Sequence, residues 1–353
     1  MPLLRMGFAP RERVTLVMLS AFQFRLSGFL LAPVIASLLA ALSLVALPRN
    51  CAASEPSRSL ILVTGAAGEE PFGEQFQESA KAWQELAEKQ NWQLTWIGQT
   101  VDQTSSDHER LQQAITTAAE AAAEHELWIV LIGHGTFSNN SAKFNLVGRD
   151  VSATELNVWL KPVRGRTVII NCSSSSAPFL TTLAANNRIV VTATRSGSEQ
   201  NFARFGKYLA QSLRDLSADL DHDREISLLE VFLAASSQTE RFYREEARLA
   251  TEHGLLDDNG DRVGTGSEFF RGVRPAKDPE AGKQVDGRVA AQAILFSAPD
   301  AIQLTAEQQA VRLRIENQLD ALRVQKSQLN EEAYLEQLEK VLLDLARLYE
   351  KAS

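Results

Sequence analysis

The sequence predicts an α/β protein with a mainly parallel sheet, followed by a C-terminal pair of helices. Between Leu60 and Phe296, short apolar runs alternate with segments of helical periodicity. The apolar runs are continuous, which is typical of strands covered on both faces. After Asp300 the chain shows only helical periodicity. With 353 residues, of which 44% are apolar and 23% charged, the chain has the composition of a folded protein and is long enough to bury a core.

The first 53 residues are predicted to be an export signal. Arginines precede an uncharged apolar run from Phe29 to Leu47, and small residues follow it. Cleavage after Ala53 would release the body into the periplasm or the medium. The run is also just long enough to cross a bilayer, so an uncleaved anchor in the inner membrane is the alternative. A lipoprotein signal at Cys51 ranks below cleavage, because the residues before it are not small and apolar.

Charge and cysteine content exclude two classes of protein. The chain carries 36 Lys and Arg against 44 Asp and Glu, a net charge of -8, which disfavours sequence-independent binding to nucleic acid. Cys51 and Cys172 are its two cysteines, so a disulfide framework is excluded. An exported body would hold Cys172 alone, and a lone thiol in an oxidising compartment is expected to be either buried or used.

The first half of the body is predicted to contain three strands and two helices. The run at 60–64 ends in a glycine-rich loop and reads as a buried strand. Apolar residues at helical spacing predict a helix at 73–89, and alternation predicts a strand at 92–97. Two serines can cap a helix at 105–123, and the apolar run at 127–132 is the third strand.

The second half continues the alternation. Apolar strands are expected at 168–170 and 189–192, with a helix at 179–185 between them. Helices are also expected at 199–213 and 227–236. Parallel sheets of this kind place their functional groups at the carboxyl ends of the strands.

The tail is predicted to be an antiparallel helical hairpin, a short coiled coil. Two stripes of apolar residues at 3 and 4 spacing define its helices: Val311, Ile315, Leu319 and Leu322, then Leu335, Leu338, Leu342, Leu345 and Tyr349. Residues 326–330 form the turn, in which Asn330 can cap the second helix. We expect the hairpin to pack on the body or on a protein partner.

Two of the predicted strands end in reactive side chains. The third strand is followed by Gly133, His134 and Gly135, and the fourth by Asn171 and Cys172. If these strands are neighbours, about 4.8 Å apart, the imidazole and the thiol emerge side by side. Histidine can then promote thiolate formation and protonate a leaving amine, while Gly135 can present an N–H to an oxyanion. A buried inert thiol is the alternative.

A strand ending in His-Gly, followed by a strand ending in Cys, resembles the caspase-like cysteine peptidases, most closely the bacterial members of the legumain family. The resemblance implies a three-layer α/β sandwich and peptide-bond cleavage or transfer through a thioester on Cys172, with His134 as acid and base. The N–H groups of Gly135 and Cys172 would hold the oxyanion. Thr192, Ala193 and Thr194 would wall the specificity pocket, and Arg204 is a candidate for orienting the substrate, with a structural ion pair as its alternative.

Two departures from the family pattern lead to a second hypothesis. Ile170 stands where legumains carry an acid two residues before the nucleophile, so asparagine specificity does not follow. The run Ser173–Ser176 lacks the glycine that usually follows the cysteine. The alternative function is therefore a catalytically inactive scaffold or interaction protein of the cell envelope.

An acidic segment at 219–230 matches the spacing of an EF-hand calcium loop. The expected ligands are the side chains of Asp219, Asp221, Asp223, Ser227 and Glu230 and the backbone carbonyl of Glu225. Arg224 stands at the sixth position, where glycine is usual and a left-handed backbone costs about 1–2 kcal/mol. A solvated acidic turn that caps the next helix is the alternative to Ca²⁺ binding. A second acidic segment, 257–261, is predicted to be a plain Asn-Gly turn.

Overall fold

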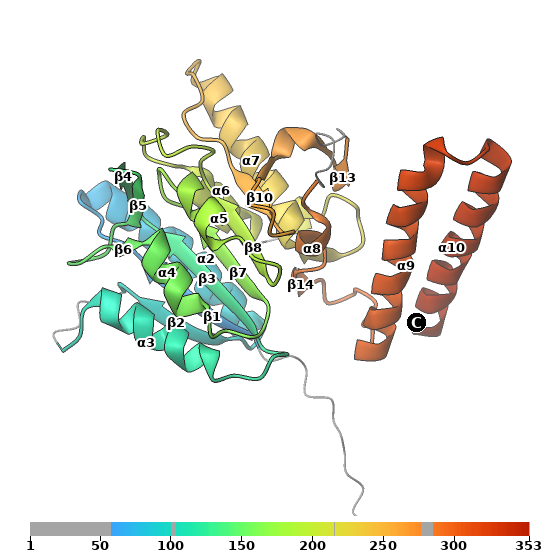
Figure 1. Cartoon of the computed structure of the whole chain (residues 1–353), viewed down its shortest axis with the longest axis horizontal. Coiled ribbons are helices and arrows are strands. Elements are labelled where there is room, and N and C mark those ends of the chain that lie inside the picture. The colour runs from blue at the N-terminus through green and yellow to red at the C-terminus, as the bar shows by residue number, and fades with distance from the viewer. Residues whose placement is uncertain (1–57, 100–103, 215, 277–284, 353) are drawn as a thin grey trace, which may run out of the picture. The chain divides into compact units, whose positions relative to one another are not determined.

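The computed structural model describes residues 58–99, 104–214, 216–276 and 285–352 (Figure 1). The chain divides into two compact units, Met1–Ala52 and Ala53–Ser353, and all described residues belong to the second. The predicted export signal therefore lies outside the described residues. None of the described helices combines the length and the apolar character that a membrane span requires.

A seven-stranded sheet forms the centre of the body, and its order is β11-β10-β8-β7-β3-β1-β2. Five of its strands run parallel: β1 (Arg58–Thr64), β2 (Gln93–Ile97), β3 (Glu126–Ile132), β7 (Thr167–Asn171) and β8 (Arg188–Thr192). Two short strands, β10 (Leu255–Asp257) and β11 (Thr265–Gly266), extend it in antiparallel direction. The predicted parallel strands are thus confirmed.

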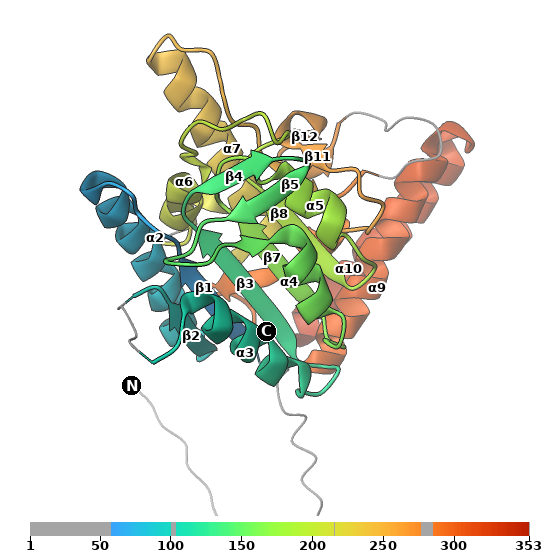
Figure 2. The same ribbon diagram turned by 60° about the vertical axis from the view of Figure 1, so that its left-hand side comes forward.

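Helices cover both faces of the sheet (Figures 1 and 2). One face packs against α2 (Glu70–Lys89), α6 (Phe205–Ser212) and α7 (Leu228–Glu245). The other face packs against α3 (Asp107–Ala119), α4 (Ala153–Leu160) and α5 (Ala177–Leu183). Central strands such as β3 are buried along their whole length because both faces are covered, which explains their uninterrupted apolar sequence. The predicted α/β class is confirmed.

Three small sheets lie outside the central one. The first contains β4 (Gly135–Ser138), β5 (Ser141–Phe144) and β6 (Val151–Ser152); the second contains β9 (Glu225–Ser227) and β14 (Ile294–Ser297); the third contains β12 (Phe270–Arg271) and β13 (Arg274–Pro275). A four-residue helix, α8 (Arg288–Ala291), precedes β14. The sequence did not predict these elements, because four residues or fewer carry too little periodicity.

The C-terminal hairpin consists of α9 (Ala306–Val324) and α10 (Glu331–Ala352). Thr305 and Gln308 form a capping box at the start of α9. Asn330 Oδ1 accepts the Ala333 N–H at 2.8 Å, which confirms the predicted cap. Ile315, Leu319 and Leu322 of α9 and Leu348 of α10 are buried. The predicted hairpin is confirmed.

Candidate functional site

The strands that carry His134 and Cys172 are direct neighbours. Leu131 of β3 is paired with Asn171 of β7, and the Cys172 N–H donates to the Leu131 carbonyl at 2.9 Å. The Cys172 side chain belongs to the core cluster on the α2, α6 and α7 face. The His134 ring contacts Phe76 of that same cluster. Both side chains therefore lie on one face of the sheet.

The thiol of Cys172 is sealed inside the protein rather than open to a cleft. The residue is 4% exposed, and a Cβ added at Gly206 of α6 would lie 2.6 Å from Cys172 Cβ and 3.1 Å from Sγ. Burial, reinforced by the Glu252 carboxylate, raises the pKa of the Cys172 thiol to about 12. Nucleophilic cysteines need the opposite shift and an accessible sulfur. The thiol thus lies in a packed environment, and its catalytic role stays a prediction.

His134 is held by contacts that do not involve the thiol. Its Nε2 lies 3.1 Å from the carbonyl oxygen of Ala67. Its ring packs edge-on against Phe72 and Phe76, with centroids 5.0 and 5.2 Å away, and against Phe202 at 5.9 Å. These contacts fix the imidazole between aromatic rings, so its position is explained by packing alone.

The two N–H groups predicted to hold an oxyanion already have acceptors. The Cys172 N–H belongs to the β3–β7 ladder, and the Gly135 N–H donates to Ser174 Oγ at 3.3 Å. Ser174 Oγ in turn donates to the Gly135 carbonyl at 3.1 Å. An oxyanion hole requires donors that point into the space where the oxyanion forms. In this structure both N–H groups are engaged within the protein, and their oxyanion role stays a prediction.

The serine run fills the space beyond β7. Its four members are buried, and Ser173 Oγ donates to Asn171 Oδ1 at 2.7 Å. A Cβ added at Gly135 would lie 2.6 Å from Ser173 Oγ and 2.2 Å from the Ser174 carbonyl oxygen, so glycine is needed there for close approach. The Ser175 N–H donates to the Glu199 carbonyl at 2.8 Å. Serines, and not the thiol, thus lie against the His-Gly turn.

The predicted wall of a specificity pocket is also closed. Thr192, Ala193 and Thr194 are 0% exposed. Ser176 Oγ accepts the N–H groups of Ala193 and Thr194 at 3.0 and 3.2 Å, and Thr192 Oγ1 donates to the Thr194 carbonyl at 3.0 Å. These polar groups are paired within the protein, and the substrate-binding role of the three residues stays a prediction.

Arg204 lies over aromatic rings, and among the described residues no carboxylate oxygen lies within ion-pair distance of its guanidinium. Its guanidinium carbon is 4.4 Å from the ring centroid of Phe242 and 5.7 Å from that of Phe202. Its backbone N–H and that of Phe205 donate to Glu252 Oε2 at 2.7 and 2.9 Å. Glu252 therefore caps α6, the helix that packs on Cys172, and burial raises its pKa. No local sequence pattern identifies this carboxylate, because its partners are distant along the chain.

Two surface depressions lie away from these residues. One of about 510 Å³ is lined by Glu70, Gly73, Gln77 and their neighbours on α2. Another of about 420 Å³ is lined by residues of α9 and α10, including Leu322 and Val341. Neither is lined by His134, Cys172 or the serine run.

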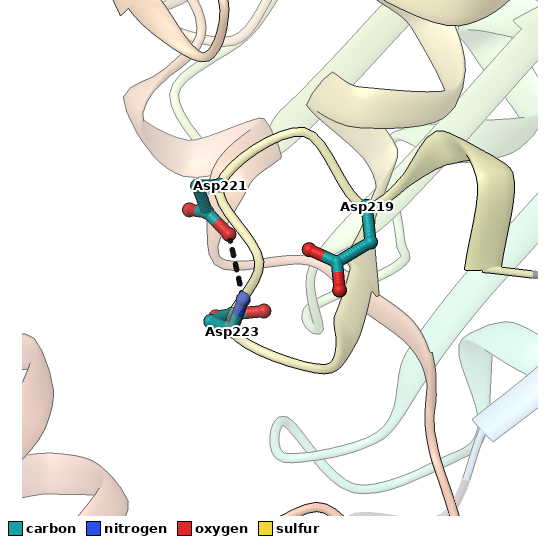
Figure 3. A group of neighbouring side chains, drawn as sticks. All are labelled: Asp219, Asp221 and Asp223. Atoms are coloured by element: carbon teal, nitrogen blue, oxygen red, sulfur yellow. Dashed lines mark hydrogen bonds between the residues drawn. The ribbon is translucent and has the colours of Figure 1, made fainter.

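The acidic loop before β9 brings three of its six predicted ligands together. One carboxylate oxygen each of Asp219, Asp221 and Asp223 lies within 4.8 Å of the others, and the Asp219 carboxylate is turned toward the other two (Figure 3). Arg224 adopts the expected left-handed conformation, with φ of 72°. Its N–H donates to Asp219 Oδ2 at 3.1 Å.

The side chains of the other three predicted ligands have partners within the protein. Ser227 and Glu230 form a capping box at the start of α7: the Glu230 N–H donates to Ser227 Oγ, and Glu230 Oε2 accepts the Ser227 N–H at 2.8 Å. Glu230 Oε1 accepts the Leu220 N–H. The Glu225 carboxylate accepts from Ser297 Oγ and pairs with Arg312 of α9. The carboxylate of Glu225, at position 7, is thus engaged in an ion pair, and that of Glu230, at position 12, caps a helix.

Comparison with solved structures finds two caspases of low sequence identity. The chain is similar to the Drosophila initiator caspase Dronc, with 14% identity and a TM-score of 0.40 over 60% of this chain and 83% of that one. It is also similar to caspase-1 from Spodoptera frugiperda, with 9% identity and a TM-score of 0.38 over 58% and 87%. No protein-family model and no curated protein sequence matches the chain. Membership of the legumain family stays a prediction.

Proposed function

We propose that the protein is a non-catalytic scaffold with a cysteine-peptidase-like α/β body, and that Cys172 serves packing rather than peptide-bond cleavage. The observation that carries the proposal is the environment of the thiol. It is 4% exposed, lies against the backbone of Gly206, and has a pKa that burial raises to about 12. A thiol with that pKa is almost entirely protonated at neutral pH and is a poor nucleophile.

The groups around the thiol support the same proposal. The N–H donors that catalysis would need are occupied, and His134 is fixed by Phe72, Phe76 and the Ala67 carbonyl. A catalytic site holds its donors ready for the developing charge. In this protein the N–H groups of Gly135 and Cys172 and the imidazole of His134 are instead engaged in hydrogen bonds and packing that stabilise the fold.

Location outside the cytoplasm is part of the proposal and rests on the sequence alone. The apolar run from Phe29 to Leu47, with arginines before it and small residues after it, supports export or anchoring. Fractionation of cells that produce the full chain tests this: the body is expected in the periplasm, the medium or the membrane fraction, and recovery in the cytoplasm would contradict it.

Alkylation of Cys172 tests the non-catalytic proposal. The native chain is treated with iodoacetamide at pH 8, and labelling is followed by mass spectrometry of the peptide that holds Cys172, which separates it from Cys51. A thiol with a pKa near 12 has about 1000-fold less thiolate than one near 9. We therefore expect labelling of the native chain to be at least about 100-fold slower than that of the urea-unfolded chain.

A matched control uses the exposed residue Ser198. Ser198→Cys in a Cys172→Ala background is expected to be labelled as fast in the native as in the unfolded chain. If native Cys172 is labelled as fast as this control, and His134→Ala slows that labelling, the thiol is an activated nucleophile and the scaffold proposal is overturned. Labelling by peptides with an electrophilic carbonyl would lead to the same conclusion.

A further inference from the structure

We propose that the loop Asp219–Asp223 binds Ca²⁺, and that Arg312 of α9 is a built-in cation that weakens this binding. The site lies on the segment that leads into β9 and does not depend on whether Cys172 is catalytic. It rests on an unsatisfied buried oxygen, on three converging carboxylates and on the position of one guanidinium.

The unsatisfied oxygen belongs to Asp219. This residue is 9% exposed, and its Oδ1 is buried without a hydrogen-bond partner among the residues that the structure describes. Its Oδ2 accepts the Arg224 N–H, so one half of the carboxylate is paired and the other is not. A buried carboxylate oxygen without a partner is costly, and nearly all buried polar groups in proteins have one. A cation at Oδ1 would supply the missing partner.

The geometry around that oxygen suits an oxygen-coordinated cation. Figure 3 shows the Asp219 carboxylate turned toward those of Asp221 and Asp223, and the three donor oxygens lie within 4.8 Å of one another. Two oxygens that bind the same Ca²⁺ at 2.3–2.6 Å can be at most about 5 Å apart. The set is therefore compact enough to contact one ion without rearrangement of the backbone.

The ligand number favours calcium with modest affinity. Ca²⁺ accepts six to eight oxygens in flexible geometry, whereas Mg²⁺ requires a near-ideal octahedron and gives up its waters reluctantly. Because Glu230 caps α7 and Glu225 faces Arg312, three carboxylates remain, and water would complete the shell. Sites with few charged ligands bind Ca²⁺ in the range of about 0.1–1 mM, which is typical of extracellular modules.

Arg312 connects this loop to the C-terminal hairpin. Its guanidinium lies 3.6 Å from Asp223 Oδ2 and pairs with Glu225 at 2.5 Å and with Glu316 at 2.9 Å. A bound dication would share the Asp223 carboxylate with a positive charge only a few ångströms away. Like charges at this distance repel, so ion and guanidinium weaken each other's hold on the loop. By reciprocity, calcium would loosen the contact between α9 and the loop as much as Arg312 weakens calcium binding.

Calorimetric titration of the full chain with CaCl₂ up to 10 mM tests the site, with NaCl of equal ionic strength and MgCl₂ as reference titrations. Saturable binding below about 1 mM and a rise in melting temperature of a few degrees are expected. Asp219→Asn is expected to weaken binding at least 10-fold. Should this buried variant fail to fold, Asp221→Asn, at an exposed position, is expected to weaken binding at least 3-fold. Asp261→Asn in the second acidic segment is the matched control and is expected to bind as the unchanged chain does.

Two variants on α9 test the coupling between Arg312 and calcium binding. Arg312→Gln is expected to tighten calcium binding about 3- to 10-fold, and Arg323→Gln, elsewhere on α9, to leave it unchanged. The site proposal is overturned by the absence of saturable heat, by equal binding of Mg²⁺, or by an equal loss of binding in Asp261→Asn. Unchanged affinity in Arg312→Gln would overturn the competition between the ion and the guanidinium.

Discussion

The two acidic loops, 219–224 and 257–262, have the same backbone and different roles. Each carries Asp at its first and fifth positions and Arg at its sixth. In both loops the N–H of the sixth residue donates to the carboxylate of the first, and the N–H of the fifth to the side chain of the third. The sixth residues, Arg224 and Arg262, have φ of 72° and 69°. The spacing of acidic residues thus determines the turn even where arginine replaces glycine.

The difference lies in the first carboxylate. Asp257 is satisfied on both oxygens, because the Gly260 N–H donates to Oδ1 at 2.8 Å and the Arg262 N–H to Oδ2 at 2.8 Å. In the first loop His222 takes the place of Gly260, and Asp219 Oδ1 remains unpaired among the described residues. The second loop also has Asn259 in place of a carboxylate at its third position. The turn at 257–262 therefore satisfies both oxygens of its first carboxylate, whereas the turn at 219–224 leaves one oxygen that a cation can bind.

The two loops differ most at their second position. Asp258 Oδ2 accepts three N–H groups at the start of α8, those of Gly287, Val289 and Ala290, at 3.0, 2.7 and 2.8 Å. In the first loop this position is Leu220, which is 39% exposed. The second loop is thus a structural junction, and variants at matched positions test the contrast.

The largest effect is expected from Asp258→Ala. Hydrogen bonds to a charged group contribute about 1.5–3 kcal/mol each, and three N–H groups lose their acceptor. Because such contributions are not additive, we expect the free energy of unfolding to fall by about 3–5 kcal/mol in urea titrations at pH 7. Leu220→Ala is the matched variant and is expected to cost less than about 1 kcal/mol. A loss below about 1 kcal/mol in Asp258→Ala would contradict the structural role of the junction.

A smaller effect is expected from Asp286, which joins the same junction. Its carboxylate accepts the Asp258 N–H at 2.9 Å and the Thr265 hydroxyl at 2.6 Å, and burial raises its pKa to about 7. An acid whose pKa is higher in the folded than in the unfolded chain binds a proton on folding, so stability is lost as the pH rises from about 4 to 7.

Asp286→Asn removes the contribution of this carboxyl group to the pH dependence of stability. The free energy of unfolding of the unchanged chain is expected to fall by about 1–3 kcal/mol more than that of the variant between pH 5 and pH 7.5. Urea titrations at several pH values measure the two slopes. Parallel slopes would show that Asp286 is already ionised in the folded chain at pH 5.

The sequence predicted the central layers of the fold because local patterns encode them. The apolar runs of β1, β3, β7 and β8 follow from burial on both faces, and the hairpin follows from its leucine stripes. The small sheets were missed because two- to four-residue strands are defined by partners distant along the chain, as in the pairing of β9 with β14.

The candidate site was only half predictable for the same reason. Strand adjacency placed His134 and Cys172 on one face, but the thiol is covered by Gly206 and its pKa is raised further by Glu252, and both residues are distant along the chain. Likewise the spacing of the acidic loop identified Asp219, Asp221 and Asp223 as neighbours. It could not show that Glu230 caps a helix or that Arg312 approaches from the C-terminal hairpin.

The smallest expected effect concerns the shared sixth position. A left-handed backbone costs a side chain about 1–2 kcal/mol, part of which glycine loses again through its greater freedom in the unfolded chain. Arg262→Gly is therefore expected to raise the free energy of unfolding by up to about 1 kcal/mol. Arg224→Gly is expected to gain less, because it also removes the ion pair between Arg224 and Asp300. Urea titrations of both variants at low and at 0.5 M salt separate the two contributions, since salt screens the ion pair and leaves backbone strain unchanged. The two variants should thus converge at high salt, and a gap that salt does not narrow would mean that the loops differ in backbone strain after all.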